Sequence, residues 1–325
     1  MELGARAFWL RSAGMGEIRP VTIPAPGPGE VLVRTLCSGV SRGTETLVFR
    51  GGVPESQHSV MRAPFQAGEF PGPVKYGYLN VGVVEHGPPD VLDRIVFCLY
   101  PHQTRYVVPA SAVTPVPDSV PPARAVLAGT VETAVNAMWD AAPLFGDRIA
   151  VVGAGMVGCC AAGLLAGLPG ARVELVDVDP GRARIAEALG VEFATPEAAV
   201  GDCDLVIHAS ATEEGLSRSL ELLAPEGEVV ELSWYGDRRV SVPLGEEFHS
   251  RRLVVRSSQV GAVSAARRGR RTFADRLSLA LDLLADPRFD ALITGESDFE
   301  ELPAVLPRLA DGELPALCHL IRYAD

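Results

Sequence analysis

The segment Gly153-Ala-Gly155-Met156-Val157-Gly158 places three glycines at the spacing of a dinucleotide-binding turn. In such a turn the first glycine permits the tight bend, the second lets the backbone approach a pyrophosphate, and the third lets the next helix pack closely. Residues 149–152 before it are apolar and β-branched, and the small residues 159–168 after it predict a helix whose N-terminus offers free N–H groups to phosphate. This strand–turn–helix context predicts a dinucleotide site.

Asp177 follows the next predicted strand, 173–176, nineteen positions after Gly158. An acidic side chain there would accept hydrogen bonds from the ribose hydroxyls of NAD(H) and would repel the 2′-phosphate of NADP(H), so we expect NAD(H) to be preferred. Arg182 leaves NADP(H) possible, because an arginine near this loop could hold a 2′-phosphate or reach the ribose. The structural alternative is that the glycines form a packed turn and Asp177 caps a loop.

The elements that would position these residues predict an α/β protein. Short strands separated by turns in the first third, at 31–35, 82–85, 93–97 and 105–108, are typical of an antiparallel, partly barrel-like β domain. From about residue 122 the pattern changes to helix–strand alternation, which predicts a parallel sheet covered by helices. The expected elements are a helix at 123–141, strands at 149–152, 173–176, 205–209 and 228–232, a helix at 273–284 and a last strand at 318–322.

Composition excludes several classes of protein. The net charge of −12 makes a nucleic-acid-binding surface unlikely, and 47% hydrophobic residues indicate a globular core. The six cysteines show no CxxC spacing and predict reduced core thiols. No N-terminal signal is visible, and the uncharged stretch 149–168 fits a strand–turn–helix better than a membrane span, so we expect a cytoplasmic protein without membrane contact. The basic run 265–271 predicts a solvated loop and helix start.

The order of β domain, dinucleotide unit and return strand resembles the medium-chain dehydrogenase/reductase superfamily, which includes the zinc alcohol dehydrogenases and their zinc-free relatives. The resemblance covers the whole chain and is carried by Pro28–Val33, Ser38-Gly-Val-Ser-Arg-Gly-Thr-Glu45, Tyr76–Gly82, Asp93–Phe97, Glu132–Ala134 and Gly146–Gly158. The segment 38–45 is most similar to the branch of bacteriochlorophyllide a dehydrogenases.

This resemblance implies an N-terminal GroES-like β domain, formed by residues 1–129 and 259–325. It also implies a Rossmann doubly wound parallel sheet at 130–258. The family active site lies in the cleft between the two domains, where a small-molecule substrate exchanges a hydride with the cofactor, and many members are homodimers.

The zinc chemistry of the family is not expected here. Zinc-dependent members place a cysteine where this chain has Ser41, a histidine where it has Tyr78, and their third ligand near Gly129-Thr130. Hydroxyls are poor ligands for Zn²⁺, which favours thiolate, imidazole and carboxylate. A different metal site built from Cys37, Glu45, His102 or Glu132 is the alternative, although no two of these have a recognised ligand spacing.

Without zinc, hydride transfer still needs a proton donor and acceptor. Tyr78 would donate a proton to the developing alkoxide, Lys75 or Arg42 would stabilise its negative charge, and Ser41 and Thr44 would orient the substrate oxygen. The structural alternative is that Tyr78 is a packed aromatic residue and Ser41 a turn residue.

Two further residues are candidates for catalysis. His102 lies beside a predicted cleft-lining strand, where an imidazole could relay a proton or simply finish a loop. Glu132 opens the helical segment that approaches nicotinamide in the family, but it could equally be an acidic residue favoured near a helix start.

The resemblance implies further cofactor contacts from Thr133 and from the segments that contain Ser210, Ala211 and Ser233. His208 lies inside an apolar strand and is expected to be a hydrogen-bonded core or cofactor-edge residue. We therefore expect an NAD(P)-dependent oxidoreductase that interconverts a secondary alcohol and a ketone on a polar small molecule. The alternatives are a zinc-free enoyl or quinone reductase and a catalytically idle NAD(H)-binding protein.

Overall fold

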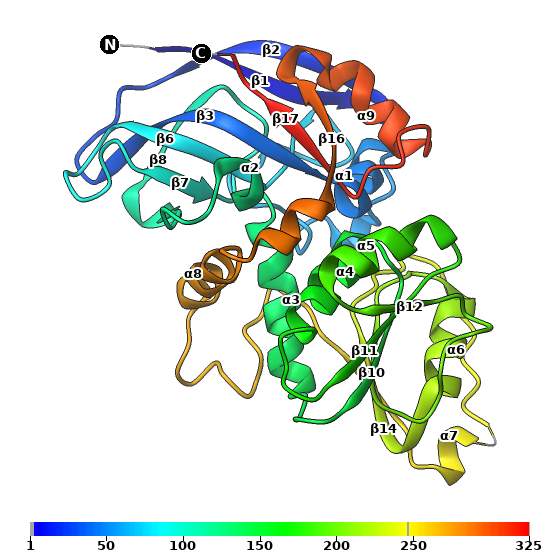
Figure 1. Cartoon of the computed structure of the whole chain (residues 1–325). Helices are drawn as coiled ribbons and strands as arrows, with labels where there is room; N and C mark the ends of the chain where they lie inside the picture. Colours follow the sequence, from blue (N-terminus) through cyan, green and yellow to red (C-terminus); the bar gives the residue numbers. More distant parts are fainter. Residues whose placement is uncertain (1–2, 246, 325) are drawn as a thin grey trace. The chain divides into compact units, whose positions relative to one another are not determined.

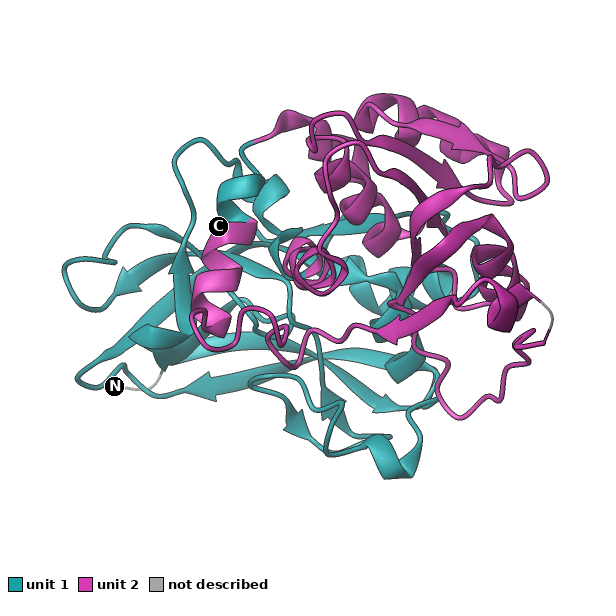
Figure 2. Cartoon of the chain, turned by 90° about the horizontal axis from the view of Figure 1, so that it is seen from below, with its two compact units in different colours: residues 1–129, 281–285, 293–325 teal, residues 130–280, 286–292 magenta. Residues whose placement is uncertain are grey.

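The computed structural model describes residues 3–245 and 247–324, and the chain divides into two compact units. Unit 1 contains residues 1–129, 281–285 and 293–325, and unit 2 contains residues 130–280 and 286–292 (Figure 2). The chain enters unit 1 again at residues 281–285, which begin within helix α8 (Phe273–Leu283), returns to unit 2 for residues 286–292, and belongs to unit 1 from residue 293.

Unit 2 is built on a six-stranded sheet in which every neighbouring pair of strands is parallel. Its strand order is β12-β11-β10-β13-β14-β15, so the order reverses between β10 and β13, where doubly wound sheets bind their ligands. The strands are β10 (Arg148–Val152), β11 (Arg172–Val176), β12 (Glu192–Ala194), β13 (Cys203–His208), β14 (Leu223–Glu231) and β15 (Val254–Ser257). The helices include α4 (Met156–Leu165), α5 (Ala183–Leu189), α6 (Glu213–Leu222) and α7 (Glu247–Ser250) (Figure 1).

The predicted helix at 123–141 is interrupted, so that α2 (Pro122–Ala125) is followed by a separate helix, α3 (Ala128–Ala141). Short 3-10 helices form at 55–57, 110–112, 180–182, 287–292 and 299–301.

Unit 1 contains two β-sheets. The larger has the strand order β16-β17-β3-β6-β7-β9, with β8 paired to β3, and the smaller has the order β2-β1-β5-β4. The strands are β1 (Leu3–Ser12), β2 (Met15–Ile23), β3 (Glu30–Ser41), β4 (Ala67–Gly68), β5 (Val74–Lys75), β6 (Asn80–His86), β7 (Ile95–Cys98), β8 (Arg105–Pro109), β9 (Val113–Pro115), β16 (Ile293–Asp298) and β17 (Cys318–Arg322). The C-terminal strand β17 pairs antiparallel with β3, which brings the end of the chain beside residues 37–41.

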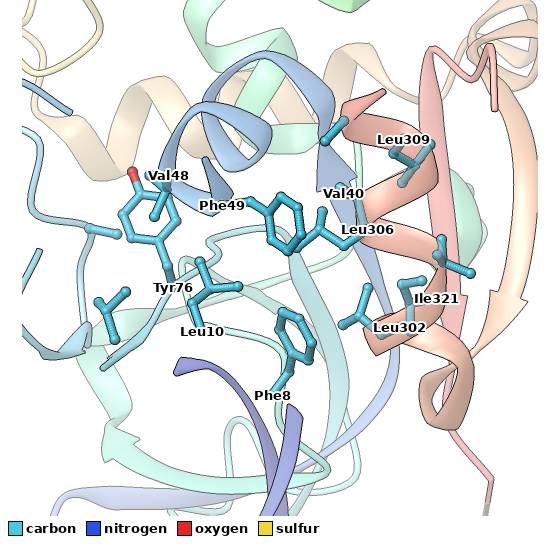
Figure 3. Close-up of a cluster of buried hydrophobic side chains, with 14 of the residues drawn as sticks. Phe8, Leu10, Val40, Val48, Phe49, Tyr76, Leu302, Leu306, Leu309 and Ile321 are labelled. Atoms are coloured by element: carbon cyan, nitrogen blue, oxygen red, sulfur yellow. The ribbon is translucent and has the colours of Figure 1, made fainter. Parts of the chain in front are cut away.

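A buried apolar cluster holds helix α1 (Arg42–Phe49) against helix α9 (Leu302–Ala310) in unit 1. Figure 3 shows Phe49 of α1 next to Leu306 of α9 within this cluster, whereas Val48 lies on the side of Tyr76. Burying one apolar side chain contributes roughly 1.5–3 kcal/mol, so this contact fixes the apolar face of α1 firmly. The first turn of α1, which carries candidate site residues, is positioned as a consequence.

The cysteine prediction is confirmed, because all six cysteines are free and buried. The uncharged stretch 149–168 forms β10 and α4, and no helix in the described part of the chain is long and apolar enough to cross a membrane. Residues 265–271 form exposed turns before α8, as expected for a solvated loop.

Candidate functional site

The glycine turn in unit 2 connects β10 to α4 and has the geometry of a dinucleotide site. Gly153 has φ +107°, and a Cβ there would lie 2.6 Å from the backbone nitrogen of Ser210. A Cβ on Gly158 would lie 1.9 Å from the carbonyl oxygen of Gly153, so neither position accepts a side chain. Gly155 instead faces open space at the N-cap of α4, with no side-chain cap. The free backbone N–H groups at the start of α4 can therefore donate hydrogen bonds to a pyrophosphate.

Asp177 lies beside this turn at the end of β11. Its Oδ2 accepts a hydrogen bond from the backbone N–H of Ala154 at 2.7 Å, and its Oδ1 accepts one from Asp179 at 2.9 Å. Each carboxylate oxygen keeps a further lone pair for a ribose hydroxyl. Arg182 forms an ion pair with Asp179 at 3.3 Å, so its guanidinium is engaged next to the turn. Met156 is buried and Val157 half-buried within the first turn of α4.

A polar cluster joins the carboxyl ends of β13 and β14. His208, which is fully buried, bonds Glu231 through Nδ1 and Ser210 through Nε2, each at 2.7 Å. Ala211 adopts a left-handed φ of +55°, and its N–H donates to the hydroxyl of Ser233 at 3.0 Å. The predicted cofactor residues Ser210, Ala211 and Ser233 therefore lie together, and the expectation of a hydrogen-bonded His208 is confirmed.

The charge of Glu231 is stabilised by this cluster. Burial alone would raise the pKa of Glu231, but hydrogen bonds from His208 and Ser233 lower it below its ordinary value. Since a carboxylate only accepts hydrogen bonds, Nδ1 of His208 donates to Glu231.

Glu132 belongs to a different unit from the other catalytic candidates. It lies in α3 of unit 2, where its Oε1 pairs with the guanidinium of Arg276 at 3.0 Å. Burial raises the pKa of Glu132, and the charge of Arg276 opposes that rise. Thr133, the next residue of α3, is half-buried in the same unit.

The remaining catalytic candidates lie together in unit 1 at the start of α1. Ser41 is the N-cap residue, but its hydroxyl makes no cap hydrogen bond. Oε1 of Glu45, one turn into the helix, instead accepts from the Ser41 N–H at 2.8 Å. This leaves the Ser41 hydroxyl available to bond the phenol of Tyr78, which is also hydrogen-bonded by Thr44.

Beneath this group lies a buried hydrogen-bond chain. Nε2 of His102 is 2.8 Å from Oε2 of Glu45, and its Nδ1 is 2.7 Å from Oγ of Ser38. The Ser38 hydroxyl is in turn 2.9 Å from the hydroxyl of Tyr323. Gly77, at φ +130°, passes so close that a Cβ would lie 3.0 Å from Cδ2 of His102, so the backbone before Tyr78 depends on a glycine.

The electrostatics of this site keep Tyr78 protonated. Burial and the negative charge of Glu45 raise the pKa of Tyr78 to about 12, although the hydrogen bonds from Ser41 and Thr44 act in the opposite direction. The phenol is half-buried and remains neutral over the whole range around pH 7. It can therefore donate a proton to an oxyanion.

The two cations proposed to stabilise charge beside Tyr78, Lys75 and Arg42, form their hydrogen bonds with other residues. Lys75 donates to the side chains of Gln103 and Tyr100, and Arg42 donates to the carbonyl of Ala316. The sequence analysis also missed Ser38, although it opens the matching segment 38–45, and Tyr323, which lies in no motif. Glu45 was identified only as a possible metal ligand, and because no helix was predicted at residues 42–49, its role at the start of α1 was not anticipated.

The donor groups do not fit a catalytic zinc site of the family. Ser41 and Tyr78, at two of the ligand positions, offer hydroxyl groups, which are poor ligands for Zn²⁺. Burial raises the pKa of the Cys37 and Cys318 thiols to about 12, and neither cysteine stands at a ligand position of the family. Within residues 3–245 and 247–324 no group of three or more His, Cys, Asp or Glu side chains is arranged to hold a metal ion.

Comparison with known proteins begins with one curated relative. An uncharacterised zinc-type alcohol dehydrogenase-like protein of Haemophilus influenzae is 26% identical over 217 residues, which cover 62% of this chain and 59% of the relative. The chain thus matches less than two thirds of that protein's length. No family model matches the chain.

Solved structures resemble the chain over nearly its whole length. L-Idonate 5-dehydrogenase of Escherichia coli K-12 has a TM-score of 0.81 at 16% identity, with 99% of each chain covered. A candidate zinc-binding dehydrogenase of Sinorhizobium meliloti, bound to NADP, has a TM-score of 0.79 at 19% identity and covers 98% of this chain and 99% of its own. A short chain alcohol dehydrogenase of Escherichia coli CFT073, in complex with NADH, has a TM-score of 0.77 at 16% identity with the same coverage. These likenesses confirm the predicted fold, a GroES-like β domain with a Rossmann sheet.

Proposed function

We propose that the chain is a medium-chain dehydrogenase/reductase that uses a nicotinamide dinucleotide to interconvert a secondary alcohol and a ketone on a polar small molecule, without catalytic zinc. The observation that carries this proposal is the half-buried phenol of Tyr78, which has hydrogen bonds with Ser41 and Thr44. Burial and the nearby charge of Glu45 raise the pKa of this phenol. It is supported by the glycine turn of unit 2 and by relatives named as alcohol or polyol dehydrogenases.

Residues of unit 2 would hold the cofactor. The N–H groups at the start of α4 would bind the pyrophosphate, and Asp177 would bind the ribose hydroxyls. NADH, when bound, supplies the hydride. We propose a preference for NAD(H) because Asp177 carries the negative charge that a 2′-phosphate would meet. Structural neighbours contain either NADP or NADH and do not decide between them.

Residues of unit 1 would manage the proton. As a ketone is reduced, negative charge develops on its oxygen, and the Tyr78 phenol would donate a hydrogen bond and then the proton. Ser41 and Thr44 would stabilise the phenolate that remains, because their hydroxyls lower the pKa of Tyr78. His102 would hold Glu45 in place rather than touch the substrate, since its side chain is only 2% exposed.

The test is a steady-state assay of Tyr78→Phe with NADH and a panel of small ketones, enones and quinones. We expect kcat to fall about 100-fold, the contribution of a general acid, with little change in the affinity for NADH. Tyr76→Phe is the matched control, because Tyr76 packs edge-on against Tyr78 and its own hydroxyl contacts only the carbonyl of Met61.

Equal turnover by wild type and Tyr78→Phe would refute the assignment of the proton donor. Turnover of enones or quinones alone would favour the zinc-free reductase alternative, and NADH binding without any turnover would favour the idle nucleotide-binding alternative. Assignment to the bacteriochlorophyllide-like branch and a homodimeric state stay predictions from the resemblance, and sedimentation analysis would test the latter.

A further inference from the structure

The chain contains a single lysine, Lys75, against 28 arginines. Ion pairs throughout the described residues use arginine as the cation, as in Arg6–Glu300 and Arg34–Glu85. Arginine is better than lysine at binding carboxylates, and it never loses its proton in proteins. Lysine differs in that its amine can become neutral and nucleophilic. Lys75 is therefore the one amine side chain of the sequence that can become neutral and act as a nucleophile.

Lys75 is buried without a counter-ion. It lies on β5 with 7% of its surface exposed, and its Nζ donates to Oε1 of Gln103 at 2.6 Å and to the hydroxyl of Tyr100 at 3.3 Å. Both partners are uncharged at neutral pH, and Nζ also lies 5.0 Å from the centre of the Tyr100 ring. In the part of the chain that the structure describes, no carboxylate forms an ion pair with it. With two acceptors for three N–H groups, the ammonium is incompletely satisfied.

The surroundings of Nζ are held rigidly. Nε2 of Gln103 donates to the carbonyl of Arg105 at 2.6 Å, which directs Oε1 toward Lys75. The Tyr100 ring stacks on Tyr106 at 3.9 Å between ring centres. Burial, with no charged neighbour contributing, lowers the pKa of Lys75 to about 8. About half of the amine is therefore neutral at pH 8, against roughly 0.3% for an ordinary lysine, a difference of about 100-fold.

One strained residue lies over this position. Phe65 has a left-handed φ of +56°, which is costly for an aromatic residue, and its half-exposed ring lies 5.4 Å from that of Tyr100. The same segment continues into β4, where Ala67 pairs with Lys75. The Phe65 ring thus packs on Tyr100, one of the two side chains that bond the amine of Lys75.

We propose that Lys75 is a carbonyl-reactive amine that captures a small aldehyde or ketone as a Schiff base. The lone pair of Nζ forms a bond to the carbonyl carbon, and the carbonyl oxygen takes up a proton. The resulting carbinolamine loses this oxygen as water, together with the second amine proton, to leave a C=N bond. No oxidant or reductant is consumed. An anion-binding role is less favoured, because arginine performs that role elsewhere in this chain.

The test is reductive trapping with glycolaldehyde and cyanoborohydride at pH 8, followed by peptide mass spectrometry, in the absence of nicotinamide cofactor. The α-amino group of the chain reacts in every sample and serves as the internal reference. We expect Lys75 in the native protein to be labelled at least tenfold faster than Lys75 in the same protein unfolded in urea, since the native amine is more often neutral. Lys75→Arg should yield no adduct at position 75.

A native rate below the unfolded rate would overturn the proposal, because it would show that burial only protects the amine. The comparison uses the wild-type chain and needs no variant to fold. It is also independent of the proposed dehydrogenase, whose failure would appear as absent NADH turnover and would leave the labelling rates unchanged.

Discussion

Replacing Glu132 by glutamine tests whether this residue acts in catalysis or neutralises a buried cation. The guanidinium of Arg276 is 1% exposed and donates through Nε to Glu132 at 3.0 Å, with further bonds to Asn136 at 2.5 Å and to the carbonyl of Val260 at 2.6 Å. Only Glu132 balances its charge in these contacts. Glu132→Gln keeps the size and one acceptor oxygen, but it removes the negative charge.

The expected cost is about 3 kcal/mol of unfolding free energy. Removing one partner of a buried ion pair costs roughly 3–5 kcal/mol, and the lower end applies because the amide oxygen of glutamine still accepts from Nε of Arg276. At a urea dependence of roughly 2 kcal/mol/M, the unfolding midpoint should fall by about 1.5 M. Replacing both partners, as Glu132→Leu with Arg276→Met, should recover most of this loss because no charge is left buried.

Urea unfolding followed by far-UV circular dichroism, together with turnover under native conditions, measures both consequences. Glu228→Gln is the control, because Glu228 pairs with the exposed Arg256 and its removal should cost under about 1 kcal/mol. An unchanged midpoint for Glu132→Gln, accompanied by lost turnover, would refute the structural role and restore the catalytic one predicted from the sequence.

Three further predictions concern the cofactor turn and the lysine. Gly158→Ala should weaken NADH binding at least 100-fold in a fluorescence titration, because its Cβ would lie 1.9 Å from the carbonyl oxygen of Gly153; near-normal binding would contradict this. Asp177→Ser should shift the ratio of NADPH to NADH affinity about tenfold toward NADPH, and an unchanged ratio would remove the argument from charge. The folded pKa of Lys75, about 8, lies below its ordinary 10.5, so the native protein binds fewer protons than the unfolded chain between these values. The unfolding free energy of wild type relative to Lys75→Met should therefore rise by about 3 kcal/mol between pH 7 and pH 11, and a constant difference would contradict it.

The Rossmann half of the fold could be predicted because its signals are local. Buried parallel strands are continuous apolar runs, and the strands expected at 149–152 and 173–176 differ from β10 and β11 by one residue. The two edge strands of this sheet, β12 and β15, were not predicted because their local signals are weak. β12 has three residues and β15 has four, so both are too short to give a clear strand pattern in the sequence.

The β domain and its site were less accessible because their contacts are distant in sequence. Strand β2 contains Pro20 and lies at the edge of its sheet. Its residues are mostly half-buried or exposed, so they show little alternation of apolar and polar positions. Ser38 and Tyr323 meet across 285 positions only because β17 pairs with β3. Spacing can identify a glycine turn, but it contains no information about such a pair.

Glu45 connects the fold of unit 1 to its proposed chemistry. Its carboxylate caps the start of α1 through the Ser41 N–H, which leaves the Ser41 hydroxyl for Tyr78, and its second oxygen bonds His102. Together with burial, its negative charge raises the pKa of Tyr78 to about 12. A phenol that holds its proton at neutral pH can donate to an oxyanion, but it cannot remove a proton from an alcohol without first being ionised. In the proposed reaction Tyr78 would therefore meet a carbonyl substrate in its protonated form near pH 7.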